Sequence, residues 1–135
     1  MVLALSAGSI LVVATLAVAC SGPATISLST REFSFAPSTL SLRAGAPVRL
    51  TLVNEGALEH DFTIHGMAGE PVQAKGSKEL GHAMDAAASN AVHVSAHPGE
   101  RVSAEFVPTA GTFEYYCSVP GHREANMRGT LHVTE

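Results

Sequence analysis

The sequence predicts an all-β fold, a Greek-key antiparallel β-sandwich of seven to eight strands with a short helix or loop insertion in the middle. Short runs rich in Val, Ile, Leu, Thr and Phe recur along most of the chain and are separated by Gly, Pro and Asn. Neither a sustained helical period nor an internal repeat is evident in the 135 residues. Together these observations favour many short strands joined by turns.

The strand-like runs follow one another at short intervals. The run VRLTLV shows the pattern most clearly, because Val48, Leu50 and Leu52 share one face while Arg49 and Thr51 share the other. Such alternation is typical of a strand with one face in the core and the other in solvent. The predicted strands are residues 26–30, 33–36, 39–43, 48–54, 61–65, 101–107, 111–118 and 129–134.

One long segment interrupts this pattern. Residues 66–90 are rich in Ala, Gly and Lys with few β-branched residues, and residues 77–89 favour a short helix. Segments of this length inside a compact domain are usually functional or carry structure of their own. Several histidines leave open a second, weak metal site, although histidines without a metal are the simpler interpretation; they are His65, His82, His93 and His97.

The N-terminal stretch predicts an exported protein. Residues 1–19 carry no charge, are almost entirely apolar or small, and run into the sequence TLAVAC. This pattern is typical of a lipoprotein-type signal peptide that is cleaved before Cys20, the residue that then receives the lipid. We expect residues 20–25 to form a tether and residues 26–135 to form the domain. An uncleaved membrane anchor is the alternative, although the apolar run is at the short limit for spanning a bilayer. Either interpretation predicts a tethered protein on the periplasmic or extracellular face of a membrane.

Composition and charge describe one globular domain and argue against one class of function. A chain of 135 residues is long enough for one domain, and 46% hydrophobic with 15% charged residues is typical of a globular core. The net charge of −4 argues against nucleic-acid binding, because phosphate contacts need clusters of Lys and Arg. If Cys20 is lipidated, Cys117 has no partner for a disulfide within the chain. A lone thiol in an oxidising compartment is a liability unless another group occupies it. Separately, we expect the protein to be a monomer.

The stretch GTFEYYCSVPGHREANMRG, residues 111–129, has the strongest functional pattern. Four residues separate Cys117 from His122 and another four separate His122 from Met127, with a Pro-Gly turn in the first interval. A blue-copper site needs two His and one Cys, with a weak, long axial Met. His60, in the sequence NEGALEHDF, is the candidate for the second imidazole. Each residue type alone commonly serves only packing, but this spacing on one loop favours a metal.

These residues resemble those of the cupredoxins, the plastocyanin/azurin group of type 1 blue copper proteins. The resemblance covers most of the chain from about residue 25 onward. Its most specific parts are EHDF at residues 59–62 and YYCSVPGHREANM at residues 115–127. It implies one copper ion, cycling between Cu(II) and Cu(I), whose ligands are His60, Cys117, His122 and, in the axial position, Met127.

The resemblance also leads to expectations about the residues beside the ligands. Members often carry Gly before the axial Met, whereas this chain has Asn126, which tolerates a left-handed backbone better than most residues. Because Glu59 precedes the first His, we expect no Gly carbonyl as an extra ligand. By resemblance, the Asp61 N–H points at the Cys117 sulfur and the Asp61 side chain bridges to Ser118.

The resemblance implies a small electron carrier rather than an enzyme. Copper oxidases reach a further copper site through a His-Cys-His run, but here Cys117 is flanked by Tyr116 and Ser118. A dinuclear copper centre needs a second Cys at position 121, which is Gly. Met among the ligands argues against a closed zinc site. Periplasmic copper binding or delivery without a redox role is the alternative.

The resemblance implies that His122 is the copper ligand whose ring edge lies nearest to solvent. We expect redox proteins, an electron donor and an acceptor, to dock there, and weak electron-transfer encounters need only a small interface. The apolar patch expected around His122 comprises Ala57, Leu58, Val119, Pro120 and Gly121.

Overall fold

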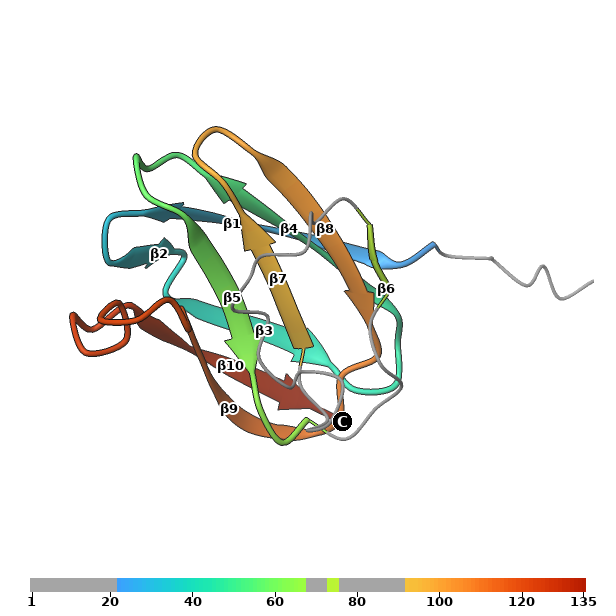
Figure 1. Cartoon of the computed structure of the whole chain (residues 1–135). Coiled ribbons are helices and arrows are strands. Elements are labelled where there is room, and N and C mark those ends of the chain that lie inside the picture. The colour runs from blue at the N-terminus through green and yellow to red at the C-terminus, as the bar shows by residue number, and fades with distance from the viewer. Residues whose placement is uncertain (1–21, 68–72, 76–91) are drawn as a thin grey trace, which may run out of the picture.

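Two β-sheets pack face to face in the protein, as Figure 1 shows for the computed structural model. The structure describes residues 22–67, 73–75 and 92–135. These residues contain ten strands and no helix, so the predicted all-β sandwich is confirmed. None of them belongs to a helix that is long and apolar enough to cross a membrane.

Each sheet contains five of these strands. The first sheet has the order β2-β1-β4-β8-β6, and the second has the order β3-β10-β9-β5-β7. The first sheet comprises β1 (Ala24–Arg31), β2 (Ser34–Ala36), β4 (Val48–Asn54), β6 (Gln73–Lys75) and β8 (Arg101–Phe106). The second comprises β3 (Thr39–Arg43), β5 (His60–Ile64), β7 (Val92–Ala96), β9 (Gly111–Tyr116) and β10 (Arg128–Thr134).

The sheets are mixed, whereas the sequence predicted antiparallel pairing throughout. β1 runs parallel to β4 and β3 runs parallel to β10, while the other pairs are antiparallel. The chain passes through β3 in the opposite sheet on its way from β1 to β4, and such a crossover allows parallel pairing. Alternation along a strand shows which face is buried, but it does not show the direction of the neighbouring strand.

β6 and β7 lie outside the strands that the sequence predicted. β7 is five residues long and pairs with β5 along its length, and β6 is a three-residue strand that pairs with β8. Runs this short give little periodicity, so their pairing partners define them. The helix predicted for residues 77–89 lies outside the described residues, as do the predicted signal peptide and Cys20.

The core lies between the two sheets. β4 alternates as predicted, with the apolar residues of its predicted inner face buried, and every residue of β5 is buried. Tyr115 is fully buried, and its ring lies 5.1 Å from the ring of Phe62, measured between centroids. The Tyr115 hydroxyl donates a hydrogen bond to the Pro37 carbonyl (2.8 Å). Gly129 permits this packing, because a Cβ on that residue would lie 2.2 Å from the Tyr115 Cζ.

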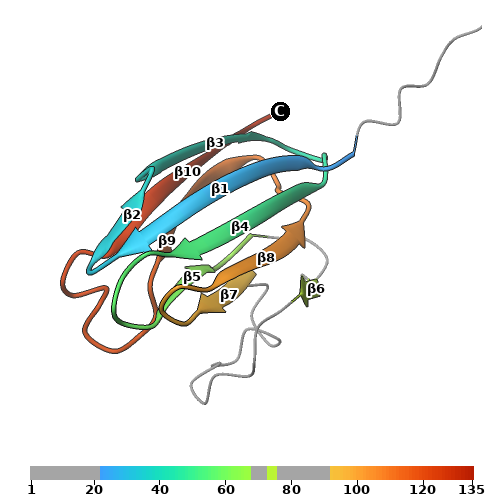
Figure 2. The same ribbon diagram turned by 90° about the horizontal axis from the view of Figure 1, so that it is seen from above.

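Three strand ends meet at one end of the sandwich. β5 begins there, β9 ends there and β10 begins there, because β9 is antiparallel to both of its neighbours. Figure 2 shows the loop between β9 and β10 at the same end as the loop that precedes β5, while β1 starts at the opposite end. This topology brings together the two stretches that the sequence singled out.

Candidate metal centre

His60, Cys117 and His122 come together at this end of the sandwich. Their possible ligand atoms, the ring nitrogens and the sulfur, lie within 4.8 Å of one another. The His122 Nδ1 is 3.3 Å from the His60 Nδ1 and 3.4 Å from the Cys117 Sγ. All three side chains are buried, and only His122 retains a small exposed fraction of 7%.

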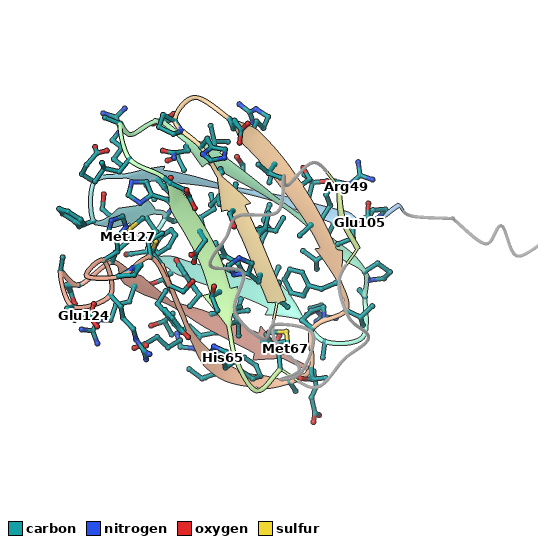
Figure 3. All side chains as sticks on the ribbon, viewed as in Figure 1. Arg49, His65, Met67, Glu105, Glu124 and Met127 are labelled. Carbon is teal, nitrogen blue, oxygen red and sulfur yellow. The ribbon has the colours of Figure 1, made fainter. Side chains whose placement is uncertain are left out.

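The loop from Cys117 to Met127 is closed by its own main chain. The Cys117 N–H donates to the Met127 carbonyl (3.1 Å), and the Met127 N–H donates to the His122 carbonyl (3.0 Å). Met127 is fully buried. Figure 3 shows Met127 at this end of the sandwich and Glu124 on the outer part of the loop. The backbone therefore sets the spacing of the three candidate ligands that the loop carries.

Two residues of this loop have a left-handed backbone. Gly121 has a φ of 86° and Asn126 has a φ of 71°. Gly adopts such a conformation readily, and Asn tolerates it better than most other residues. Asn126, the residue before Met127, therefore has the left-handed backbone that we expected an Asn to tolerate at this position.

Asp61 connects β5 to the loop 117–127. Its N–H donates to the Cys117 Sγ (3.4 Å). Its buried carboxylate accepts hydrogen bonds from the Ser118 N–H (2.7 Å) and the Ser118 Oγ (2.6 Å), and a third from the Thr63 Oγ1 (3.0 Å). The contacts of Asp61 with Cys117 and Ser118 that the resemblance implied are present, and Thr63 is an addition to them.

Asn54, which the sequence did not single out, holds the loop that precedes His60. Its Nδ2 donates to the carbonyls of Leu58 (2.7 Å) and Ala96 (2.9 Å). Its Oδ1 accepts a hydrogen bond from the Gly56 N–H (2.9 Å). At the sequence level Asn54 looks like an ordinary polar residue at the end of a strand, so no pattern identifies this role.

The turn between β1 and β2 also reaches the site. The Glu32 Oε1 accepts hydrogen bonds from the N–H groups of Ala57 (2.5 Å) and Leu58 (3.1 Å). Phe33 is 42% exposed, and its ring meets the His122 ring edge-on with centroids 5.1 Å apart. Neither residue was predicted, because both come from a turn that is far from the candidate ligands along the chain.

Burial sets the protonation of the site. Desolvation raises the pKa of the Cys117 thiol to about 11, with a smaller contribution from the Asp61 charge, while the Asp61 N–H acts in the opposite direction. Desolvation, followed by the neighbouring His122, lowers the pKa of His60. At neutral pH and without a metal, the site therefore holds a protonated thiol beside a neutral His60. A metal ion held there would bind Cys117 as the thiolate, and the thiol proton would be released to solvent.

Apart from His60 and His122, none of the histidines that the structure describes joins this cluster. His65 stacks on Tyr116, with ring centroids 5.8 Å apart, and Figure 3 shows it at the far end of β5. His93 and His97 also lie outside the only cluster of metal-binding type in the described part of the chain. His82 lies outside the described residues.

The donor set fits copper. Thiolate and thioether sulfur suit Cu(I), and imidazole suits Cu(II), so a mixed set serves both oxidation states. Here two imidazoles and a thiol are buried together, and a loop that ends in a buried Met closes around them. A β-sandwich with such a cluster at one end defines the class of protein, a small mononuclear copper protein of the cupredoxin type.

Comparison with known proteins gives the family. The family model for copper binding proteins of the plastocyanin/azurin family matches residues 24–134. The chain belongs to this family, and its cofactor is one copper ion.

Two sequence relatives illustrate the range of the family. The copper-resistant cuproprotein CopI of Rubrivivax gelatinosus is 34% identical over 99 residues, which cover 73% of this chain and 59% of CopI. Auracyanin-B of Chloroflexus aurantiacus is 33% identical over 118 residues, which cover 75% of this chain and 47% of auracyanin-B. The chain therefore spans about half to three fifths of the length of these two relatives.

Solved structures share the fold. Auracyanin B superposes with a TM-score of 0.63 at 29% identity, and the match covers 85% of this chain and 92% of auracyanin B. Auracyanin A of Chloroflexus aurantiacus, described as a "blue" copper protein, superposes with a TM-score of 0.59 at 26% identity. That match covers 84% of this chain and 100% of auracyanin A.

Proposed function

We propose that this protein carries single electrons between redox partners through one copper ion bound by His60, Cys117 and His122, with Met127 as the axial ligand. The observation that carries the proposal is the buried cluster, in which two imidazoles and a thiol lie within 4.8 Å of one another. These residues would hold a copper ion that can exist as Cu(II) and as Cu(I), so the site would be able to accept one electron from a donor protein and release it to an acceptor protein.

The protein contributes a site that is formed before the metal binds. Main-chain hydrogen bonds fix the donors of the loop 117–127, and the Asp61 carboxylate connects β5 to Ser118 on that loop. Donors held in this way move little when the oxidation state changes, which favours rapid electron transfer. The Asp61 N–H, 3.4 Å from the Cys117 Sγ, stabilises the thiolate form of this ligand.

An exposed apolar surface around His122 supports docking of redox proteins there. Leu58 is 45% exposed and Phe33 is 42% exposed. His122 is the candidate ligand that retains exposed surface, so a partner that covers this patch comes closest to the metal. The structure adds Phe33 to the expected patch of Ala57, Leu58, Val119, Pro120 and Gly121.

Copper binding or delivery without electron transfer is the second candidate function. CopI, with 34% identity to this chain, is described as a copper-resistant cuproprotein, and this favours a role in handling copper itself. The two functions differ in kinetics, because a carrier retains its copper and a delivery protein releases it to an acceptor. Neither proposal includes catalysis, since Cys117 is flanked by Tyr116 and Ser118 rather than by two His.

Export and tethering to a membrane are part of the proposal. The uncharged, apolar residues 1–19 followed by Cys20 support it. Ala24, where β1 starts, lies at the opposite end of the sandwich from the ligand loop (Figure 2). A lipid or anchor attached through residues 20–25 thus leaves the candidate site of a monomeric carrier accessible to its partners.

The visible spectrum of the Cu(II)-loaded protein, compared with that of Cys117→Ser, tests the proposed function. We expect an intense thiolate-to-copper band that is absent from the variant and is bleached reversibly by a reductant. A colourless protein that binds copper weakly, or that prefers zinc, would contradict the electron-carrier proposal. A blue protein that passes its copper quickly to a competing chelator would favour delivery instead.

A further inference from the structure

Glu32 lies in the turn between β1 and β2, and its carboxylate approaches the outer side of the His60 imidazole. We propose that Glu32 is a positioning residue for His60. Its carboxylate keeps the proton on the outer ring nitrogen, Nε2, so that the inner nitrogen, Nδ1, is free to bind the metal. The same negative charge favours Cu(II) over Cu(I). This inference rests on the proposed copper site.

The two ring nitrogens of His60 have different surroundings. Nδ1 lies 3.3 Å from the Nδ1 of His122, inside the cluster of candidate ligands. Nε2 is buried, has no hydrogen-bond partner among the described residues, and lies 3.9 Å from the Glu32 Oε1. At that distance the contact is electrostatic and is not a hydrogen bond. A buried N–H without a partner is unfavourable, so a neighbouring negative charge stabilises the proton at this position.

The position of the Glu32 carboxylate is set by the loop that precedes His60. Oε1 accepts the N–H groups of Ala57 (2.5 Å) and Leu58 (3.1 Å), although the Glu32 side chain is 41% exposed. Gly56 permits this approach, because a Cβ at that residue would lie 2.5 Å from Oε1. The carboxylate is therefore held beside the imidazole by specific contacts.

A carboxylate in this position has a defined effect on a metal-binding histidine. Histidines that bind metals almost always direct their other ring N–H at a carboxylate, a backbone carbonyl or a water. Such a partner fixes the tautomer and makes the metal-binding nitrogen more basic. A more basic ligand and a nearby negative charge both stabilise the higher oxidation state. We therefore infer that Glu32 lowers the reduction potential of the site.

Glu32→Gln separates the effect of the Glu32 charge on His60 from the hydrogen bonds that Glu32 makes to the loop. The amide oxygen of Gln still accepts the Ala57 and Leu58 N–H groups, while the negative charge is lost. At a fixed solution potential we expect the ratio of Cu(II) to Cu(I) to fall about threefold, the size of effect typical of a partly exposed charge. The matched control is Glu55→Gln, which removes a surface charge paired with Arg31 (3.1 Å) and should leave the ratio unchanged.

Gly56→Ala moves the same carboxylate without removing its charge. The added Cβ occupies the space in which the Glu32 Oε1 lies, and the flexible side chain must turn away. We expect the ratio of Cu(II) to Cu(I) to change in the same direction as in Glu32→Gln, by a smaller factor. A ratio that moves in the opposite direction would contradict the proposed role of Glu32.

The tautomer of His60 tests the proposal without copper. NMR of the histidine ring nitrogens in the metal-free protein, above neutral pH, should show His60 protonated at Nε2 in the wild type and partly at Nδ1 in Glu32→Gln. A wild-type His60 protonated at Nδ1, or an unchanged Cu(II)-to-Cu(I) ratio in Glu32→Gln, would overturn the proposal. Failure of the copper site itself would appear separately, as a missing thiolate-to-copper band in the loaded wild type.

Discussion

The protein holds its candidate ligands in two different ways. Three of them lie on the loop 117–127, where main-chain hydrogen bonds within the loop set their spacing. His60 lies on a strand far earlier in the chain, and the side chains of Asp61 and Asn54 hold the backbone on either side of it. The comparison shows that the local part of the site depends on backbone conformation, whereas the distant ligand depends on a few buried polar side chains.

Asp61→Ala should have the largest effect, because it breaks the connection between the two parts. Ser118 and Thr63 lose their shared acceptor in a buried environment, so we expect the free energy of unfolding to fall by about 3 kcal/mol. Asp61→Asn, which keeps one carbonyl acceptor, should cost about 1.5 kcal/mol. Chemical denaturation of the metal-free proteins measures both changes. Unchanged copper retention and reduction potential in Asp61→Ala would show that this bridge does not support the site.

Asn54→Ala should weaken only the part of the site that contains His60 and should leave the loop 117–127 unchanged. It removes two hydrogen bonds to the loop that precedes His60 and one to the Ala96 carbonyl in β7, and we expect the free energy of unfolding to fall by about 2 kcal/mol together with weaker copper retention. Thr51→Ala is the matched control on the same strand, because it removes a hydrogen bond to Ser103 (3.0 Å) away from the site. If both variants retain copper equally well, Asn54 serves the fold rather than His60.

Cys117 on the loop and His60 on β5 should also contribute differently to the pH dependence of copper affinity. The raised pKa of Cys117, about 11, means that a metal must displace the thiol proton at every pH below that value. Copper affinity should therefore rise with pH, about tenfold per unit between neutral pH and about pH 11. The lowered pKa of His60 leaves it neutral over this range, so it adds no slope. Competition titrations at several pH values measure the slope, which should disappear in Cys117→Ser.

The smallest effect tests the backbone of the loop. Asn126→Ala places a residue with a Cβ and no local polar group at a φ of 71°, which should cost about 1 kcal/mol in unfolding free energy. Asn126→Gly should stay within a few tenths of the wild-type value, because Gly adopts this conformation readily. Equal stabilities of the two variants would mean that the left-handed conformation is not what the loop requires of this position.

The fold class and the residues that gather at the site were predictable where the sequence carries a local pattern. Alternation in VRLTLV predicted a half-buried strand, and the spacing within residues 117–127 predicted a loop with three ligand-type side chains. The parallel pairs and β7 were not predictable, because pairing direction depends on segments far apart in the chain. Glu32, Phe33 and Asn54 escaped notice for the same reason, since they reach the site only after folding.

The place of β10 in the second sheet determines when the site can be assembled during biosynthesis. β10 pairs with β9 on one side and with β3 on the other, and Met127 immediately precedes it. A ribosome delivers β3 and β9 before β10, so a nascent chain cannot close the ligand loop until β10 has emerged. Pairing between such distant strands is also slow compared with local folding. We therefore expect copper to be loaded as a step of maturation, after residues 128–134 have been synthesised.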